Sequence, residues 1–138
     1  MRLTVRAKGF EMVRQGLEDL GAEVPKIGRR RMRTVMNRVV RRMQEYPSER
    51  PGQKYTRTGL FFRRWMIKEI ARVGYRIENT RPAGQYVVGD AYGTTQAWMH
   101  KGRWPLFRDV TDEELKELPK EFLDEIMIVA RREGFDTP

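Results

Sequence analysis

The sequence contains no cysteine and a single histidine, His100. Without cysteine the chain forms no disulfide, has no thiolate nucleophile and offers no thiolate ligands to zinc. One histidine is too few for a histidine-rich metal site. The chain also lacks the roughly 20-residue apolar run of a membrane span, and its first residues lack the apolar stretch of a signal peptide. We therefore expect a protein made in the cytoplasm, without cofactor, metal or membrane partner.

Acidic residues are scarce in the first half of the chain. The net charge of the 138 residues is +9, but residues 1–72 hold 19 Lys/Arg against 7 Asp/Glu, whereas residues 73–138 hold 9 against 12. A basic surface favours a polyanionic partner such as nucleic acid. The opposite signs of the two halves also suit head-to-tail contact between copies of the chain.

Apolar periodicity predicts a strand over residues 2–7, a helix over 10–21 that ends at Gly21, and a second helix over 27–46 that begins near Pro25. The second helix has one apolar stripe, formed by Met32, Val35, Met36, Val39, Val40 and Met43. The rest of its surface carries seven arginines: Arg29, Arg30, Arg31, Arg33, Arg38, Arg41 and Arg42. Like charges this close repel one another unless phosphates or carboxylates lie near them.

The middle of the chain predicts a loop followed by strands. Residues 46–59 are rich in Pro, Gly and polar side chains, and loops of this length are often functional. Alternating residues on both sides of Gly74 predict a β-hairpin from 61–73 and 74–80. We expect a third strand over 84–90.

The C-terminal part predicts a helix over residues 111–134. Thr111 and Glu114 match a capping box at its start, and Pro119 should split it because proline cannot donate the interior hydrogen bond. The acidic side chains of 111–125 would suit the arginines, in the same subunit or in the next one.

These elements predict an α+β domain in which N-terminal amphipathic helices and a C-terminal helix pack around a small antiparallel β-sheet. We assign residues 1–135 to this single domain and expect 136–138 to be a disordered tail.

The stretch "AWMHKGRW", residues 97–104, concentrates chemistry-bearing side chains. His100 is a candidate general acid or base, but no carboxylate or nucleophile lies near it in sequence. Glycine beside basic residues at 57–59 and 101–103 falls short of a phosphate-binding P-loop. We therefore expect no catalytic residue and no enzymatic activity.

Two classes of binding protein remain. Arginines could contact phosphates while Tyr55, Trp98 and Trp104 stack on bases. The chain would then be a basic nucleic-acid-binding protein, or a small toxin-like nuclease that cleaves RNA. Trp, Tyr, Arg and Met are also the residues enriched in the cores of protein interfaces. A domain that scaffolds other proteins is therefore equally consistent with the composition.

The order of several short segments resembles a family of tailed bacteriophages. "YPSERPGQKYTRTGLFFRRW" is followed by the hairpin, "GQYVVGD", "QAWMHKGRW" and "FRDV" before the last helix. This order resembles small neck or tail-completion (head–tail joining) proteins of the minor tail protein Z type. A first family motif is matched by Arg57, Thr58, Gly59 and Leu60 with the aromatic Trp65 after it. A second is matched by His100, Gly102, Arg103, Trp104, Asp109 and Val110.

The resemblance implies a non-enzymatic virion protein of a siphophage-like particle, located at the neck or upper tail. There it would form a homo-oligomeric ring that joins or completes the tail, with the connector or adaptor and the tail-tube proteins as partners. Nonspecific contact with packaged DNA is a further expectation.

Residue roles follow from that reading. The expected interface residues are Tyr55, Arg57, Trp98, His100, Lys101, Arg103 and Trp104. Those expected to face DNA or an acidic partner are Arg30, Arg31, Arg38, Arg41 and Arg42. Those expected to be structural are Thr58, Gly59, Leu60, Trp65 and Gly102.

Overall fold

A computed structural model describes most of the chain. The described residues are 4–5, 10–54, 57–70, 75–90 and 92–136. The elements in chain order are β1 (Thr4–Val5), α1 (Phe10–Met43), the 3₁₀ turn η1 (Phe62–Arg64), β2 (Trp65–Glu69), β3 (Tyr75–Asn79), α2 (Gly84–Val88), the 3₁₀ turn η2 (Trp98–His100), α3 (Phe107–Lys116), α4 (Leu118–Arg132) and β4 (Phe135–Asp136). Helices with small antiparallel sheets make this the α+β class that the sequence predicted.

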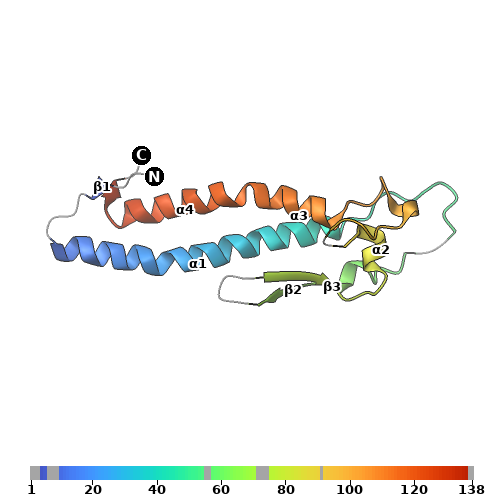
Figure 1. Ribbon diagram of the computed structural model, residues 1–138, viewed down its shortest axis with the longest axis horizontal. Helices are drawn as coiled ribbons and strands as arrows, with labels where there is room; N and C mark the ends of the chain where they lie inside the picture. The colour runs from blue at the N-terminus through green and yellow to red at the C-terminus, as the bar shows by residue number, and fades with distance from the viewer. Residues whose placement is uncertain (1–3, 6–9, 55–56, 71–74, 91, 137–138) are drawn as a thin grey trace.

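The molecule is elongated, with α1 along its whole helical part (Figure 1). Helices α3 and α4 return antiparallel along one side of α1, and the β2–β3 hairpin lies along the other side. At one end, β1 pairs antiparallel with β4. The described parts of residues 44–64 and 80–106 gather at the opposite end, which we name the loop end; α1, α3 and α4 together form the helical shaft.

Helix α1 is continuous where the sequence predicted two helices. It runs through Gly21 and Pro25 without a break, so the predicted boundary between 10–21 and 27–46 was wrong. Leu20 and Ile27, on either side of the proline, are both buried against α4. Proline inside a helix costs about 3 kcal/mol relative to alanine. The burial of Leu20 and Ile27 against α4 outweighs that cost.

The apolar stripe predicted for the arginine-rich helix is confirmed. Val35, Met36, Val39 and Met43 are buried. Two separate core clusters result, one near the termini and one near the loop end. The first contains Leu20, Ile27, Val129, Ala130 and Phe135; the second contains Val39, Met43, Val88, Trp104 and Val110.

The predicted hairpin is present, but the predicted third strand is not. Strands β2 and β3 pair antiparallel with Ile67 opposite Ile77, whereas Gly74 lies outside the described residues. Residues 84–88 form the helix α2 instead of a strand. Val88 is buried and Val87 is half-buried. One face of a helical turn therefore covers both valines, so these two residues do not require a strand.

The C-terminal helices begin earlier than predicted. Helix α3 starts at Phe107, and the hydroxyl of Thr111 donates to the Phe107 carbonyl at 2.8 Å, so Thr111 lies inside the helix and the capping-box prediction was wrong. Pro119 lies in the first turn of α4, which confirms the predicted break. Asp136, expected in a disordered tail, pairs with Thr4 in the β1–β4 sheet; residues 137–138 lie outside the described part.

Candidate functional site

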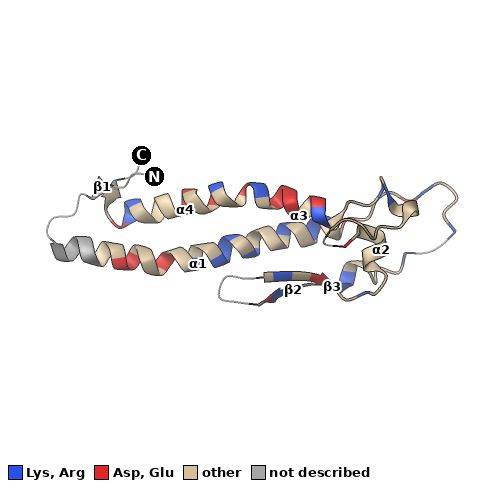
Figure 2. Ribbon diagram, in the orientation of Figure 1, with Lys and Arg blue, Asp and Glu red and all other residues tan. Residues whose placement is uncertain are grey.

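The arginine-rich part of α1 lies alongside α3 and α4 of the same chain, where acidic residues are concentrated (Figure 2). Arg38 donates from Nε to Glu114 at 2.7 Å and from Nη1 to Glu121 at 3.1 Å. Arg42 donates to Glu113 at 2.7 Å and to Glu114 at 3.0 Å. Burial acts to raise the pKa of Glu114, but the hydrogen bonds from Arg42 and Arg38 outweigh it and hold that pKa below its ordinary value.

A second set of ion pairs lies further toward the termini. Arg30 and Arg31 both pair with Glu125. Burial again acts to raise the pKa of this carboxyl, and the two guanidinium groups lower it overall. Arg41 is exposed, as Arg30 is, but it makes no ion pair with a described residue. Four of the five arginines expected to face DNA or an acidic partner therefore pair with the chain's own acidic helices.

Because of this pairing, the uncompensated positive charge lies in the segment of the chain that connects α1 to α3. Residues 46–110 hold 12 Lys/Arg against 5 Asp/Glu, which is +7 of the net +9. The predicted polyanion surface on α1 is thus largely neutralised within the chain, and the connecting segment carries the uncompensated charge.

The two tryptophans of "AWMHKGRW" have opposite environments. Trp104 is only 9% exposed, and its ring packs edge-on against Tyr46 at 5.3 Å and against Phe61 at 5.6 Å between centroids. Trp98, in η2, is 79% exposed. Trp104 was predicted to be an interface residue, but it is buried in its own subunit and has little surface to offer a neighbour.

A glycine turn and two arginines tie η2 to the long loop. Gly102 has φ +74°, a conformation that favours glycine, and it sets the turn between Lys101 and Arg103. Arg103 donates to the Ser48 carbonyl at 2.8 Å, and Arg50 reaches back to the Met99 carbonyl at 2.8 Å. Lys101 is exposed.

Arg57 stabilises the long loop by contacting residues at the start of that loop. Its Nη1 donates to the Pro47 carbonyl at 2.6 Å, and its guanidinium lies 5.4 Å from the centre of the Tyr46 ring. Its Nε is 3.9 Å from a carboxylate oxygen of Glu49, which is an ion pair too long for a hydrogen bond. Tyr55, predicted as its neighbour in the interface, lies outside the described residues.

The residues predicted to be structural lie beside this loop. The Thr58 hydroxyl accepts the Leu60 N–H at 3.4 Å, and Gly59 has φ +70°. Trp65 stacks on Phe107 with ring centroids 5.6 Å apart. Leu60 is exposed, so the motif orders the turn rather than filling the core through this leucine.

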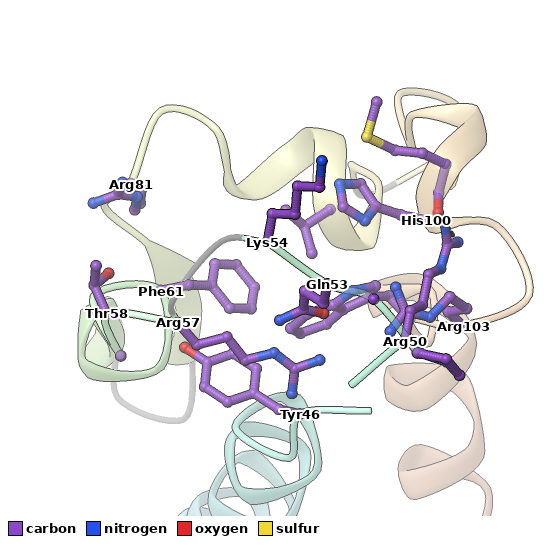
Figure 3. A pocket seen from close by; sticks show the side chains of 16 residues that line it. Tyr46, Arg50, Gln53, Lys54, Arg57, Thr58, Phe61, Arg81, His100 and Arg103 are labelled. Atoms are coloured by element: carbon purple, nitrogen blue, oxygen red, sulfur yellow. Dashed lines mark hydrogen bonds between the residues drawn. The ribbon is translucent and has the colours of Figure 1, made fainter. Parts of the chain in front are cut away.

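These elements border an open cavity of about 470 Å³ at the loop end (Figure 3). Five of its described lining residues are cationic: Arg50, Lys54, Arg57, Arg81 and Arg103. None of the described lining residues is a carboxylate. Three aromatic residues also line it: Tyr46, Phe61 and Trp104.

Several buried polar atoms of the cavity lining lack a hydrogen-bond partner among the described residues. They include Nη2 of Arg57, Nε1 of Trp104 and Nδ1 of His100. A buried donor without an acceptor costs about 1–3 kcal/mol. These atoms are closed off from solvent, so they lie in the packing beside the pocket and do not face it.

His100 lies in a positively charged environment. Burial lowers its pKa, and the nearby charges of Arg103 and Arg50 lower it further. Its ring meets Trp104 edge-on, with centroids 6.3 Å apart. The acid–base or nuclease reading of His100 needs a carboxylate beside it, and the described residues of this cavity supply none. Nor do the described residues contain a cluster of three metal-ligating side chains.

Sequence reasoning did not identify Arg50, Lys54 and Arg81 as one group. They come from two separate segments, and no spacing in the sequence relates them. Only the ties from the loop to η2 and the turn after β3 bring them around one cavity.

The chain matches no protein-family model, no curated protein and no solved structure. Within its described part, no helix is both long enough and apolar enough to cross a membrane.

Proposed function

We propose that this chain is a head–tail joining or tail-completion protein of a tailed, siphophage-like phage. It acts without enzymatic activity by assembling with copies of itself and with connector or tail-tube proteins. The motif order around Arg57 and Trp104 supports the family. The single structural observation that carries an assembly role is the concentration of exposed aromatic residues at the loop end.

That exposed surface is formed by α2, η2 and the turn between them. Tyr92 and Trp98 are 78% and 79% exposed, and Tyr86 and Met99 are exposed as well. The Ala97 N–H donates to the Tyr86 carbonyl at 2.8 Å, which holds α2 and η2 together. Aromatic and methionine side chains are typical of interface cores, and large residues left in water gain free energy when a partner covers them.

The rest of the architecture suits such a role. The helical shaft is held by two core clusters and by ion pairs, and it separates the loop end from the termini. The arginines that could have contacted DNA are mostly paired with glutamates. Protein association is therefore favoured over binding of DNA along α1.

Labelling in the virion tests the proposal. A tag on this chain in the source phage or prophage should be located by electron microscopy at the neck or upper tail. Trp98→Ala and Tyr92→Ala, both at exposed positions, should reduce incorporation while the free subunit stays folded. Absence of the label from purified particles would contradict the proposal, and the protein should then be assayed for nucleic-acid binding across a salt series.

A further inference from the structure

A second open groove lies between α1 and the β2–β3 hairpin. Its volume is about 550 Å³, and Glu69 and Tyr75 border it on the hairpin side. The hairpin lies on the opposite side of α1 from α3 and α4 (Figure 1). Glu69 is the one carboxylate among the described lining residues, against four cations from α1: Lys26, Arg29, Arg30 and Arg33. The groove therefore has an excess of positive charge.

The polar side chains of α1 follow this groove in a single row. Lys26, Arg29, Arg33 and Asn37 line it at intervals of three or four residues, which is the spacing that places side chains on one edge of a helix. Arg41 continues the row at the same spacing and is exposed. From residue 26 to residue 41 the row extends over about 22 Å. It therefore suits an extended anion better than a compact one.

The charges of this row are accessible to a ligand in solution. Arg33 is exposed and forms no ion pair with a described residue. Lys26 pairs with Glu23 at 3.0 Å, and 67% of the lysine side chain remains exposed. Arg29 lies 3.6 Å from a carboxylate oxygen of Glu69, and both side chains are about half exposed. Water screens such pairs and makes them weak, so a ligand with several negative charges can compete with these two carboxylates.

The chemistry of the lining favours nucleic acid over an acidic protein. Interfaces between proteins are built around buried apolar anchors, whereas Tyr75 and Pro25 are the only apolar members of the described lining. Asn37 and Thr34 add an amide and a hydroxyl to the cations. Proteins contact the phosphates and sugars of nucleic acids with this set of side chains. Such interfaces are also more polar and more positively charged than those between proteins.

The row suits a duplex better than a single strand. Proteins hold single strands by stacking the bases on aromatic side chains, and Tyr75 is the one aromatic residue in the described part of this lining. A duplex presents one negative charge per 1.7 Å of its axis, which gives about a dozen charges along the row. Contacts to phosphates position a protein on the duplex but carry no sequence information.

We propose that this groove binds the phosphate backbone of double-stranded nucleic acid, without preference for base sequence. Lys26, Arg29 and Arg33 make the central contacts, and Arg41 extends them toward the loop end. The arginines that pair with glutamates of α3, such as Arg38, take no part. The site does not rest on the proposed function, because the free chain binds a duplex without another copy or a phage partner. The aromatic surface of the loop end stays available to proteins.

The salt dependence of binding by the purified full chain tests the proposal. Fluorescence anisotropy of a short labelled DNA duplex gives the association constant at salt concentrations from about 50 to 200 mM. Contacts from four cations predict a slope of about −3.6 for the logarithm of this constant against the logarithm of the salt concentration, since each contributes about 0.9. Duplexes of different sequence should bind equally well. A single strand of the same length should bind more weakly.

Variants locate the contacts. Lys26→Gln and Arg33→Gln should each weaken binding about two- to fivefold and make the slope shallower by about 0.9. The double variant should make it shallower by about 1.8. Lys116→Gln removes the same charge from α3, on the acidic side of the shaft, and is the matched control that should change neither quantity. All three positions are exposed, and thermal denaturation checks that each variant stays folded.

Two further measurements separate this groove from the rival place and the rival partner. Lys54→Gln, at the exposed rim of the loop-end cavity, should leave the slope unchanged. A labelled oligoglutamate of similar net charge should bind more weakly than the duplex.

Four results would overturn the proposal. The first is no binding of the duplex at the lowest salt concentration, and the second is an unchanged slope in the Lys26→Gln/Arg33→Gln double variant. The third is a shallower slope in Lys54→Gln, which would move the contact to the loop end. The fourth is binding of the single strand or the oligoglutamate as tightly as the duplex, which would assign the groove to another partner.

Discussion

Arginine has two different environments in the helical shaft and at the loop end. In the shaft, Arg38 and Arg42 donate to glutamates of α3 and α4, so both their N–H groups and their charge are compensated. At the loop end, Arg50, Arg57 and Arg103 donate to backbone carbonyls. A carbonyl accepts the hydrogen bond but does not cancel the positive charge.

This difference explains where the field of the molecule is concentrated. The same residue type stabilises the pairing of helices in one region, whereas the loop end, residues 44–64 and 80–106, holds 8 Lys/Arg against 3 Asp/Glu and so has a charge of +5. Summed charge over a small surface attracts counter-charged partners and accelerates their approach. The sequence count of arginines alone would have assigned that attraction to α1.

The largest expected effect separates the two tryptophans of the loop end. Trp104→Ala should lower the free energy of unfolding by about 3–5 kcal/mol, because it leaves a cavity among Tyr46 and Phe61. Trp98→Ala, at a surface position, should change it by less than about 0.5 kcal/mol. Urea denaturation of both variants measures the contrast. Equal losses would mean that Trp98 also belongs to the core.

In the shaft, Glu114→Gln should cost about 1–3 kcal/mol, since Arg38 and Arg42 would lose a shared, partly buried carboxylate. Glu117→Gln, at an exposed position in the turn between α3 and α4, is the matched control and should cost little. If the two variants unfolded at the same urea concentration, the ion pairs of the shaft would contribute nothing measurable to stability.

Acid should loosen the shaft through the same carboxylates. The pKa values of Glu114 and Glu125 are lower in the folded protein than their ordinary value of 4.5. Their contribution is therefore complete above that value and is lost as the pH falls through the folded pKa. Glu125→Gln should unfold with a shallower dependence on pH in this range than the unmodified chain. Unchanged steepness in the variant would show that Glu125 does not contribute to acid unfolding.

Sequence reasoning predicted the class of fold, the apolar stripe of α1, the hairpin and the break at Pro119, because each depends on local periodicity or on a single proline. It missed the continuity of α1 through Pro25, since packing of Leu20 and Ile27 on α4 is a tertiary effect. It left open whether the arginines meet glutamates of the same chain. The cavity could not be predicted, because its lining converges only when the loop, α2 and η2 fold together.

The smallest expected effect is a dependence of stability on pH that arises from His100 at the loop end. Burial, with Arg103 and Arg50, lowers its folded pKa below the ordinary 6.5. As the pH falls below that value, the unfolded chain binds the proton first, so stability declines until the folded pKa is passed. His100→Gln should remove this slope while leaving the acid transition of the glutamates in the shaft. Urea midpoints measured on either side of 6.5 would compare the two chains. The same slope in both would mean that the positive charge of the loop end does not reach His100.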